Sequence, residues 1–452
     1  AGGAITSYTI TASPGGATQT VPGSVTEVAF NGLQPGTAYS FQVSAANTYG
    51  SGPVSSPSSA TTPNAAAETY AGWFNWYDRA SPGMAVDNVH LVNPGAAAVN
   101  ACVILPGVAV APLAVPPGGE RYQAFDPGSI GGPVRVLGDG RLIASQRVAY
   151  YQSFNEVAAR TAADASTSQF FNWYDNASPG MSADNIHLVN PGPATATVTV
   201  SLPGSSPLAF TLAPGQESYG AFPAGTIGGP VAVTSSAPVL ASQRVTFNQS
   251  FNEVAATPAA KASTSLFFNW YDSASAGMSV DNVHLVNPGP AAAAGTVSLP
   301  GAAPLAFSLA PGQETYVAFP AGTIGGPVAV TSSAPVIASQ RVSFFGSFNE
   351  VAGRAPGDAA TQAWFNWYDR ASPGMNADNV HLLNPGSGPV SGTISLPGAA
   401  PIPFSLAAGT EGYYSFPSGT VNGPVTVSAT APILASQRVA YFQSFNEVSG
   451  QS

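Results

Sequence analysis

The chain has 452 residues, of which 44% are hydrophobic and only 8% are charged, with 49 glycines and 42 prolines. This composition is too apolar for disorder and too rich in turn residues for long helices, so it favours several all-β domains. The net charge of −10, with Lys261 as the only lysine, argues against nucleic acid or an anionic membrane surface as partner, because both require basic clusters. Apolar runs are broken by Pro or Gly well short of the roughly 20 residues of a membrane span, which argues against membrane insertion in this segment.

Residues 1–63 form the first expected unit. Its distinctive segments are Ile5–Ile10, Leu33–Asn47 and Gly50–Pro53. On these residues the unit resembles the latter part of a fibronectin type III domain. The resemblance implies an incomplete β-sandwich in which Leu33 and Tyr39 pack at the corner of the sandwich.

The first two strands of that family, including the tryptophan usually found on the second, have no counterpart before Ala1. We expect a processed or truncated N terminus, or a longer native chain; the alternative is that another chain supplies the missing strands by β-strand addition. A sandwich without these strands exposes an apolar groove beside unpaired strand edges. The expected assembly groove consists of Tyr8, Ile10, Phe30, Phe41 and Val43.

Four tandem repeats follow, and each opens with Phe-Asn-Trp-Tyr-Asp and closes near Ser-Phe-Asn-Glu-Val. The openings recur with a period of 97 residues, at Phe74, Phe171, Phe268 and Phe365. The expected β-sandwich repeats span 70–157, 167–254, 264–351 and 362–448. Their Asn-Pro-Gly and Ala-Pro-Gly turns make them similar to immunoglobulin-like repeat modules of bacterial secreted and cell-surface proteins. That resemblance implies an extracellular or cell-surface location.

Within one repeat, short apolar or alternating runs bounded by turn residues predict about seven strands. The run 195–202 alternates apolar and polar residues, as a half-buried antiparallel strand does. The pattern is typical of an immunoglobulin-like sandwich. The expected strands are Gln169–Tyr174, Asn185–Val189, Thr195–Leu202, Leu208–Leu212, Glu217–Phe222, Val231–Thr234 and Leu240–Phe247.

The segments Ala158–Ser168, Ala255–Ser265 and Ala352–Gln362 are rich in small and polar residues. We interpret them as linkers. Their equal length implies a fixed offset from one module to the next, as in stalks and solenoid-like arrays. The expected architecture is therefore an elongated, all-β, multi-domain chain of tandem immunoglobulin-like and fibronectin III-like sandwiches.

A set of ionisable residues recurs in register in the four copies. Carboxylates with one histidine near strand ends favour Ca²⁺ or a transition metal. The alternative is a polar latch, in which the arginine pairs with a carboxylate and the Asn and His satisfy buried backbone groups. We favour the latch and expect no cofactor, with Ca²⁺ as the alternative. The set comprises Asp78, Asp87, His90, Arg147 and Glu156; Asp175, Asp184, His187, Arg244 and Glu253; Asp272, Asp281, His284, Arg341 and Glu350; and Asp369, Asp378, His381, Arg438 and Glu447.

Catalysis is not expected. Ser145, His90 and Asp87 supply the residue types of a Ser-His-Asp triad, but no Gly-x-Ser-x-Gly elbow, metalloprotease helix or glycine-rich phosphate loop accompanies them. A single active site would also occur once and not in four tandem copies. We therefore predict that the protein is not an enzyme and that it has no catalytic residues.

The aromatic signature allows a second interpretation, in which exposed rings stack on sugars beside Asp and Asn groups. Alternation in Phe-Asn-Trp-Tyr places Phe74 and Trp76 on one face and Asn75 and Tyr77 on the other, so Trp76 is assigned to the core. The candidate glycan contacts are then the four tyrosines, Tyr77, Tyr174, Tyr271 and Tyr368.

The function that the sequence favours is structural: a subunit of an extracellular fibre or cell-surface stalk, self-associating head to tail through the incomplete N-terminal domain. The alternative is a multivalent adhesin or carbohydrate-binding array, in which repetition supplies avidity toward surface glycans or other surface proteins.

Overall fold

The computed structural model describes residues 3–26, 28, 30, 38–59, 69–108 and 112–452. In this part of the chain the structure is all-β, as predicted, apart from three short 3-10 turns. These turns are η1 (Ala162–Asp164), η2 (Ala259–Lys261) and η3 (Pro356–Asp358). Among the described residues, therefore, no helix has the length or the apolar character needed to cross a bilayer.

The N-terminal unit is a four-stranded antiparallel sheet. Its strands are β1 (Ser7–Ser13), β2 (Thr18–Pro22), β3 (Ser40–Asn47) and β4 (Gly50–Ser51), in the order β2-β1-β3-β4. Ile10 and Tyr39 are buried. Leu33, expected to pack beside Tyr39, lies outside the described residues.

Each repeat is a sandwich of two antiparallel sheets, and in repeats 2, 3 and 4 the two sheets share one long strand. In repeat 2 the shared strand is β23 (Val231–Phe247). Its first part pairs with β16 and β19, and its second part pairs with β18 and β24. The sequence predicts two strands here, but Pro238 between them does not interrupt a single 17-residue strand. Repeat 1 has two separate strands at this place, β12 and β13.

The remaining strand bounds follow in chain order. Repeat 1 contains β5 (Tyr70–Phe74), β6 (Tyr77–Asp78), β7 (Met84–Val92), β8 (Val99–Ile104), β9 (Pro112–Val115), β10 (Glu120–Gln123), β11 (Ile130–Gly131), β12 (Val134–Gly138), β13 (Ile143–Tyr150), β14 (Ser153–Ala158) and β15 (Arg160–Thr161). Repeat 2 contains β16 (Ser166–Phe171), β17 (Tyr174–Asp175), β18 (Met181–Val189), β19 (Ala196–Ser201), β20 (Leu208–Leu212), β21 (Glu217–Gly220), β22 (Ile227–Gly228), β24 (Ser250–Ala255) and β25 (Thr257–Pro258). Repeat 3 contains β26 (Ser263–Phe268), β27 (Tyr271–Asp272), β28 (Met278–Val286), β29 (Ala293–Ser298), β30 (Leu305–Leu309), β31 (Glu314–Val317), β32 (Ile324–Gly325), β33 (Val328–Phe344) and β34 (Ser347–Ala352). Repeat 4 contains β35 (Ala360–Phe365), β36 (Tyr368–Asp369), β37 (Met375–Leu383), β38 (Val390–Ser395), β39 (Ile402–Leu406), β40 (Glu411–Tyr414), β41 (Val421–Asn422), β42 (Val425–Tyr441) and β43 (Ser444–Ser449).

The core of each sandwich lies between its two sheets. In repeat 2 it contains Ile186, Leu188, Val198, Val200 and Phe222, all buried. The alternation predicted for 195–202 is observed in β19, whose residues are alternately buried and exposed. Every second side chain of a strand faces the partner sheet, so each sandwich holds an independent apolar core.

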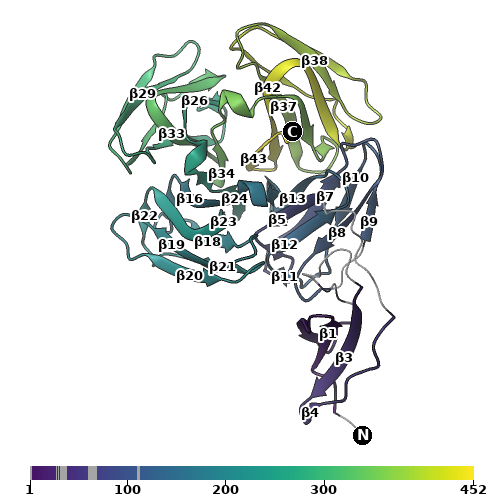
Figure 1. The fold of residues 1–452 in the computed structure, drawn as a ribbon. Helices are drawn as coiled ribbons and strands as arrows, with labels where there is room; N and C mark the ends of the chain where they lie inside the picture. The colour runs from purple at the N-terminus through teal and green to yellow at the C-terminus, as the bar shows by residue number, and fades with distance from the viewer. Residues whose placement is uncertain (1–2, 27, 29, 31–37, 60–68, 109–111) are drawn as a thin grey trace.

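The four sandwiches are arranged around a common centre and form a closed ring (Figure 1). The strands built from Ser-Phe-Asn-Glu-Val, which are β14, β24, β34 and β43, occupy that centre, and each contacts the next, including the last with the first. A serine hydroxyl of one strand accepts a hydrogen bond from a backbone N–H of its neighbour. The four bonds are Phe251 N to Ser153 Oγ at 3.1 Å, Phe348 N to Ser250 Oγ at 3.0 Å, Phe445 N to Ser347 Oγ at 3.3 Å and Phe154 N to Ser444 Oγ at 3.0 Å.

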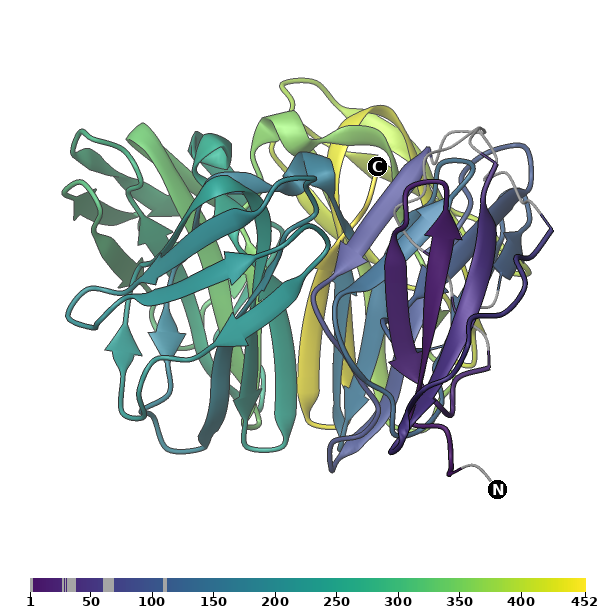
Figure 2. The ribbon, with the colours of Figure 1, turned by 60° about the horizontal axis from the view of Figure 1, so that its bottom comes forward.

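The rod-like shape expected from the equal spacing is therefore wrong. Figure 2 shows the long strands of the repeats standing side by side around the ring. The elongated interpretation rested on the equal length of the segments between repeats, which does not determine how neighbouring repeats pack. In the folded chain those ends are buried against each other, because the central strands place their Ser and Asn side chains against the neighbouring backbone.

The segments expected to be linkers are also structured. The first contains β15, which pairs with β5 of repeat 1, followed by η1 and the start of β16. Arg160 donates from Nη1 to the carbonyl of Ala241 in repeat 2 at 3.0 Å. At the closing joint, Gln451 donates to the carbonyl of Ala144 in repeat 1 at 3.2 Å. These segments therefore fasten neighbouring sandwiches and do not space them apart.

Candidate functional site: the clefts between neighbouring repeats

Neighbouring repeats meet through the Asn-Trp pair of the opening signature. The loop between β5 and β6 carries Asn75 and Trp76 across to β18 and β21 of repeat 2. Asn75 donates from Nδ2 to the carbonyl of His187 at 3.1 Å. The Trp76 ring lies 5.5 Å from the ring of His187 and 5.6 Å from that of Tyr219.

The same contact recurs at the other three joints. Asn172 and Asn269 donate to the carbonyls of His284 and His381 at 3.1 and 3.2 Å, and Asn366 of repeat 4 donates to His90 of repeat 1 at 3.0 Å. Trp367 packs on His90 with the ring centroids 6.0 Å apart. The closing joint is therefore built like the joints between consecutive repeats.

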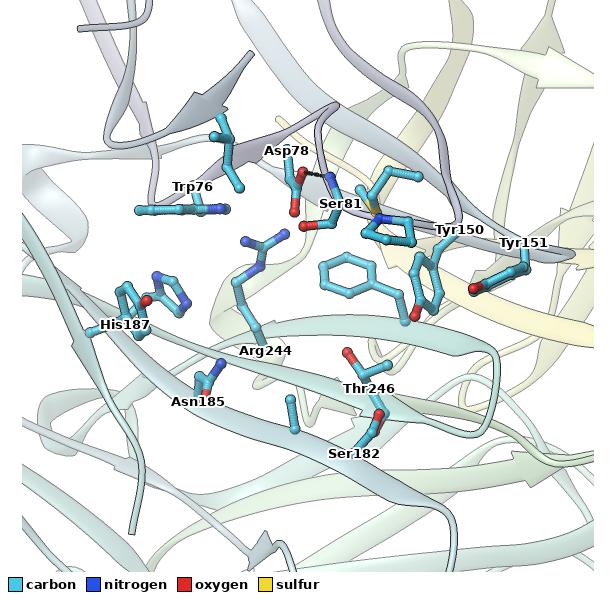
Figure 3. A pocket seen from close by; sticks show the side chains of 16 residues that line it. Trp76, Asp78, Ser81, Tyr150, Tyr151, Ser182, Asn185, His187, Arg244 and Thr246 are labelled. Carbon is cyan, nitrogen blue, oxygen red and sulfur yellow. Dashed lines mark hydrogen bonds between the residues drawn. The ribbon is translucent and has the colours of Figure 1, made fainter. Parts of the chain in front are cut away.

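A cleft opens beside each of the three consecutive joints. The cleft between repeats 1 and 2 has a volume of about 530 Å³, that between repeats 3 and 4 about 430 Å³, and that between repeats 2 and 3 about 210 Å³. In the first cleft Trp76 and His187 lie at one end and Tyr150 and Tyr151 at the other, with Arg244 between them (Figure 3). Tyr219 stacks on His187 and leaves 52% of its surface exposed, so it extends the aromatic wall toward solvent.

The polar groups in the middle of this cleft have spare hydrogen-bonding capacity. Asp78 accepts from the backbone N–H groups of Ala80 and Ser81 through Oδ1, which positions its second oxygen, Oδ2. Within the described residues, that oxygen, the Asn185 amide and the terminal nitrogens of Arg244 make no hydrogen bond. Buried and half-buried polar groups normally find partners. An acceptor and two sets of donors are thus presented beside an aromatic wall.

Arg244 is held in place from below. Its Nε lies 3.0 Å from Glu253 Oε2, and its guanidinium group lies over the Phe251 ring at 4.7 Å. Ser242 donates to the other oxygen of Glu253 at 2.6 Å. Because Glu253 neutralises the guanidinium charge, the floor of the cleft suits a neutral hydrogen-bonding ligand better than a strongly anionic one.

Each cleft histidine pairs with a glutamate that the sequence interpretation missed. His187 Nδ1 lies 2.8 Å from Glu217 Oε1, and the same contact joins His90 to Glu120 at 2.7 Å. Burial lowers the pKa of His187 well below its usual value and raises the pKa of Glu217 to about 8. Both shifts favour the uncharged pair, which suits a ring that stacks on Tyr219. The signal was available, because Glu120, Glu217, Glu314 and Glu411 also recur in register.

The ionisable residues selected from the sequence do not form one cluster. Asp87 is buried beside the joint and accepts from the Asp78 N–H at 2.8 Å and from Gln146 at 2.7 Å. Burial raises its pKa to about 7 despite these hydrogen bonds. Arg147 lies 3.0 Å from Glu156, a pairing of the kind the latch hypothesis proposed. The other three copies repeat the Arg–Glu contact at 3.0 Å.

In the part of the chain that the structure describes, no three His, Cys, Asp or Glu side chains gather as metal ligands would. The residue types of a triad are also directed elsewhere. Ser145 donates to Glu156 at 2.6 Å, and His90 pairs with Glu120.

The assignment of the signature aromatics is wrong. Tyr77 is completely buried; its hydroxyl donates to the Asp87 carbonyl at 2.7 Å and accepts from the Phe125 N–H at 2.9 Å. Tyr174, Tyr271 and Tyr368 are also at most 1% exposed, so none of the four can contact a glycan. Trp76, assigned to the core, lines the cleft. Simple alternation fails because the chain turns between β5 and β6.

The proposed assembly groove is reproduced in part. An apolar groove of about 380 Å³ runs along the N-terminal sheet and is lined by Tyr8, Ile10 and Val43, together with Val21 and Val28. Phe30 and Phe41, the other two residues of the predicted set, do not line it. Their rings pack on each other at 5.3 Å.

Comparisons with known proteins identify the N-terminal unit. Residues 1–61 match the family model of the fibronectin type III domain, which confirms the resemblance based on the segments around Tyr8, Tyr39 and Pro53. Among curated proteins, none matches the sequence significantly.

The solved structures with weak similarity include the following two. One is Streptomyces avermitilis alpha-L-rhamnosidase complexed with L-rhamnose, at 12% identity and a TM-score of 0.12, covering 94% of this chain and 52% of the other. The chain thus spans about half the length of the rhamnosidase. The second is a tetra-tandem repeat in the extending region of a large adhesion protein, at 8% identity and a TM-score of 0.10, covering 81% of this chain and 95% of the other. Scores this low carry no functional argument.

Proposed function

We propose that the protein is an extracellular, multivalent carbohydrate-binding module with an adhesive role, and that its ligands occupy the clefts between neighbouring repeats. The observation that carries this proposal is the combination of an aromatic wall with unpaired Asp, Asn and Arg groups in the clefts between repeats 1 and 2 and between repeats 3 and 4. Sugars have apolar C–H faces that stack on aromatic rings and hydroxyl groups that act as both donors and acceptors.

The geometry of one cleft matches these needs. A carboxylate oxygen of Asp78 accepts from a sugar hydroxyl, while the Asn185 amide and the Arg244 guanidinium donate to the neighbouring hydroxyls. Trp76 and Tyr219 supply the stacking surface at one end of the cleft. A neutral sugar leaves the Arg244–Glu253 pair undisturbed.

The ring adds valency. Because the four joints share the Asn–His and Trp–His contacts, one chain presents several sites at fixed separation. Such an array binds a repetitive surface much more tightly than a single site does, provided that the spacing of the ligands allows simultaneous contact. Individual affinities in the millimolar range are then sufficient for adhesion.

The test is binding of the full chain to a glycan array and to free oligosaccharides. Replacing Asn88, Asn185, Asn282 and Asn379 together by alanine removes a ligand contact without breaking an intramolecular side-chain bond of the described chain, so the ring should stay folded. Binding should be lost in this variant. Tyr49→Ala is the matched control, because Tyr49 is 87% exposed on the N-terminal domain and away from the clefts. Glycan binding that survives the quadruple substitution would contradict the proposal.

A second function is favoured by the groove on the N-terminal sheet. Its apolar lining of Tyr8, Ile10 and Val43 suits a β-strand or apolar segment of another copy, so we propose head-to-tail self-association through this groove into a fibre. Val43 is 36% exposed, so Val43→Asp should abolish concentration-dependent assembly without unfolding the domain. Light scattering that finds a monomer at high concentration would rule out this function and leave the cleft proposal standing.

A further inference from the structure

The clefts share their central polar groups but differ at one end. Asp78, Asn185 and Arg244 in the cleft between repeats 1 and 2 correspond to Asp272, Asn379 and Arg438 in the cleft between repeats 3 and 4. The end away from the tryptophan is polar in the first cleft and apolar in the second.

In the first cleft this end is lined by hydroxyl groups. Tyr150, Tyr151, Ser182 and Thr246 all face the cleft there (Figure 3). The Ser182 hydroxyl donates to the Thr246 carbonyl at 3.2 Å. Within the described residues the hydroxyls of the two tyrosines and of Thr246 make no hydrogen bond, so they are available to a ligand.

In the second cleft two of the hydroxyl groups that line this end of the first cleft are absent. Phe344 replaces Tyr150 and Ala440 replaces Thr246, while Ala377 corresponds to Ala183, which also lines the first cleft. Burying a ligand hydroxyl against this wall would leave it without a partner, which is costly, whereas a methyl group would be accommodated.

We infer that the two clefts select different sugars: the cleft between repeats 1 and 2 takes a ring with a hydroxymethyl group at this end, and the cleft between repeats 3 and 4 takes a 6-deoxy ring with a methyl group there. This inference rests on the proposed carbohydrate function. One chain would thereby recognise two different sugars on the same surface.

The experiment uses the full chain in two forms, each with one active cleft. In the first form Asn88, Asn282 and Asn379 are replaced by alanine, and in the second form Asn88, Asn185 and Asn282 are replaced. The probes are three pairs of methyl glycosides: D-galactoside and 6-deoxy-D-galactoside, and the corresponding glucosides and mannosides. Dissociation constants are measured by NMR titration. For whichever pair binds, the first form should prefer the 6-hydroxy member and the second the 6-deoxy member, each by about ten-fold, the effect of one hydrogen bond.

A variant that restores the missing hydroxyl groups tests whether they determine the sugar preference. Phe344→Tyr together with Ala440→Thr, made in the second form, should shift its preference toward the 6-hydroxy member. Equal preferences in the two forms, or a preference unaffected by this exchange, would overturn the inference but leave carbohydrate binding intact. If wild-type protein binds none of the glycosides and no glycan on the array, the proposed function itself fails and the inference fails with it.

Discussion

Closure of the ring makes a prediction that no open chain of repeats would share. Asn366 is 1% exposed and donates to the His90 carbonyl, 276 positions away in the sequence, at 3.0 Å. In a rod this asparagine of the last repeat would have no partner repeat. In the ring, Asn366→Ala removes a buried hydrogen bond and leaves a cavity at the joint, which should cost about 1–3 kcal/mol of unfolding free energy.

The matched variant is Asn172→Ala, because Asn172 donates to the His284 carbonyl at 3.1 Å and is equally buried. Both variants are compared with wild type by urea denaturation, followed by tryptophan fluorescence. The two midpoints should fall by similar amounts. Small-angle scattering provides a second measure, because a compact body formed by the four repeats has a radius of gyration of about 21 Å. Closure would be refuted if Asn366→Ala left the urea midpoint unchanged while Asn172→Ala lowered it. A radius of gyration much larger than this would refute it as well.

Three further outcomes follow from buried groups. Burial raises the pKa of Asp87, Asp184, Asp281 and Asp378 to about 7 from an ordinary 3.8, so the folded state retains protons that the unfolded state has lost, and stability should fall as pH rises to 8. Each such group contributes up to about 1.4 kcal/mol per pH unit. Melting curves between pH 7 and 8 test this, because an unfolded histidine, with a pKa of about 6.5, is mostly neutral in that range and opposes the trend only weakly. Asp184→Asn should weaken this pH dependence, and an unchanged profile would show that Asp184 does not titrate there. Tyr174→Phe should lower the free energy of unfolding by about 1–3 kcal/mol, because the hydrogen bonds of its hydroxyl with the Asp184 carbonyl and the Phe222 N–H are lost. Glycan binding should stay at the wild-type level. Unchanged stability with loss of glycan binding would show instead that Tyr174 contacts the ligand.

Much of the sandwich fold could be predicted from local sequence patterns. The alternation in 195–202 and the turn residues around it indicate a strand, because successive side chains of a strand point to opposite faces. The same logic failed at Phe-Asn-Trp-Tyr. There the chain leaves β5 and re-enters a sheet at β6, so Asn75 and Trp76 lie in a connecting loop and the alternation across them is lost.

The ring could not be predicted in this way, because its contacts join positions about one repeat apart. The Asn–His bonds span 112 residues along the chain, and the Ser hydroxyl bonds between consecutive central strands span 98. A period of 97 residues gives the spacing of the modules but not their rotation. One clue was present in the strand Ser-Phe-Asn-Glu-Val, whose Ser and Asn are two residues apart and so lie on one face. In the ring these two side chains accept hydrogen bonds from a neighbouring repeat.

Equal repeat length, which first favoured a stalk, instead explains the closure. Each repeat presents Asn and Trp on one side and the His carbonyl and ring on the other, which is a heterologous contact that generates either a filament or a closed ring. Identical modules joined by connections of equal length make the rotation at each joint the same, and here four such rotations return the chain to its start. Once Asn366 has bonded to repeat 1, no joint of this kind is left open. A fifth repeat would have no place in the ring, so repetition in this chain fixes the number of clefts and does not add length.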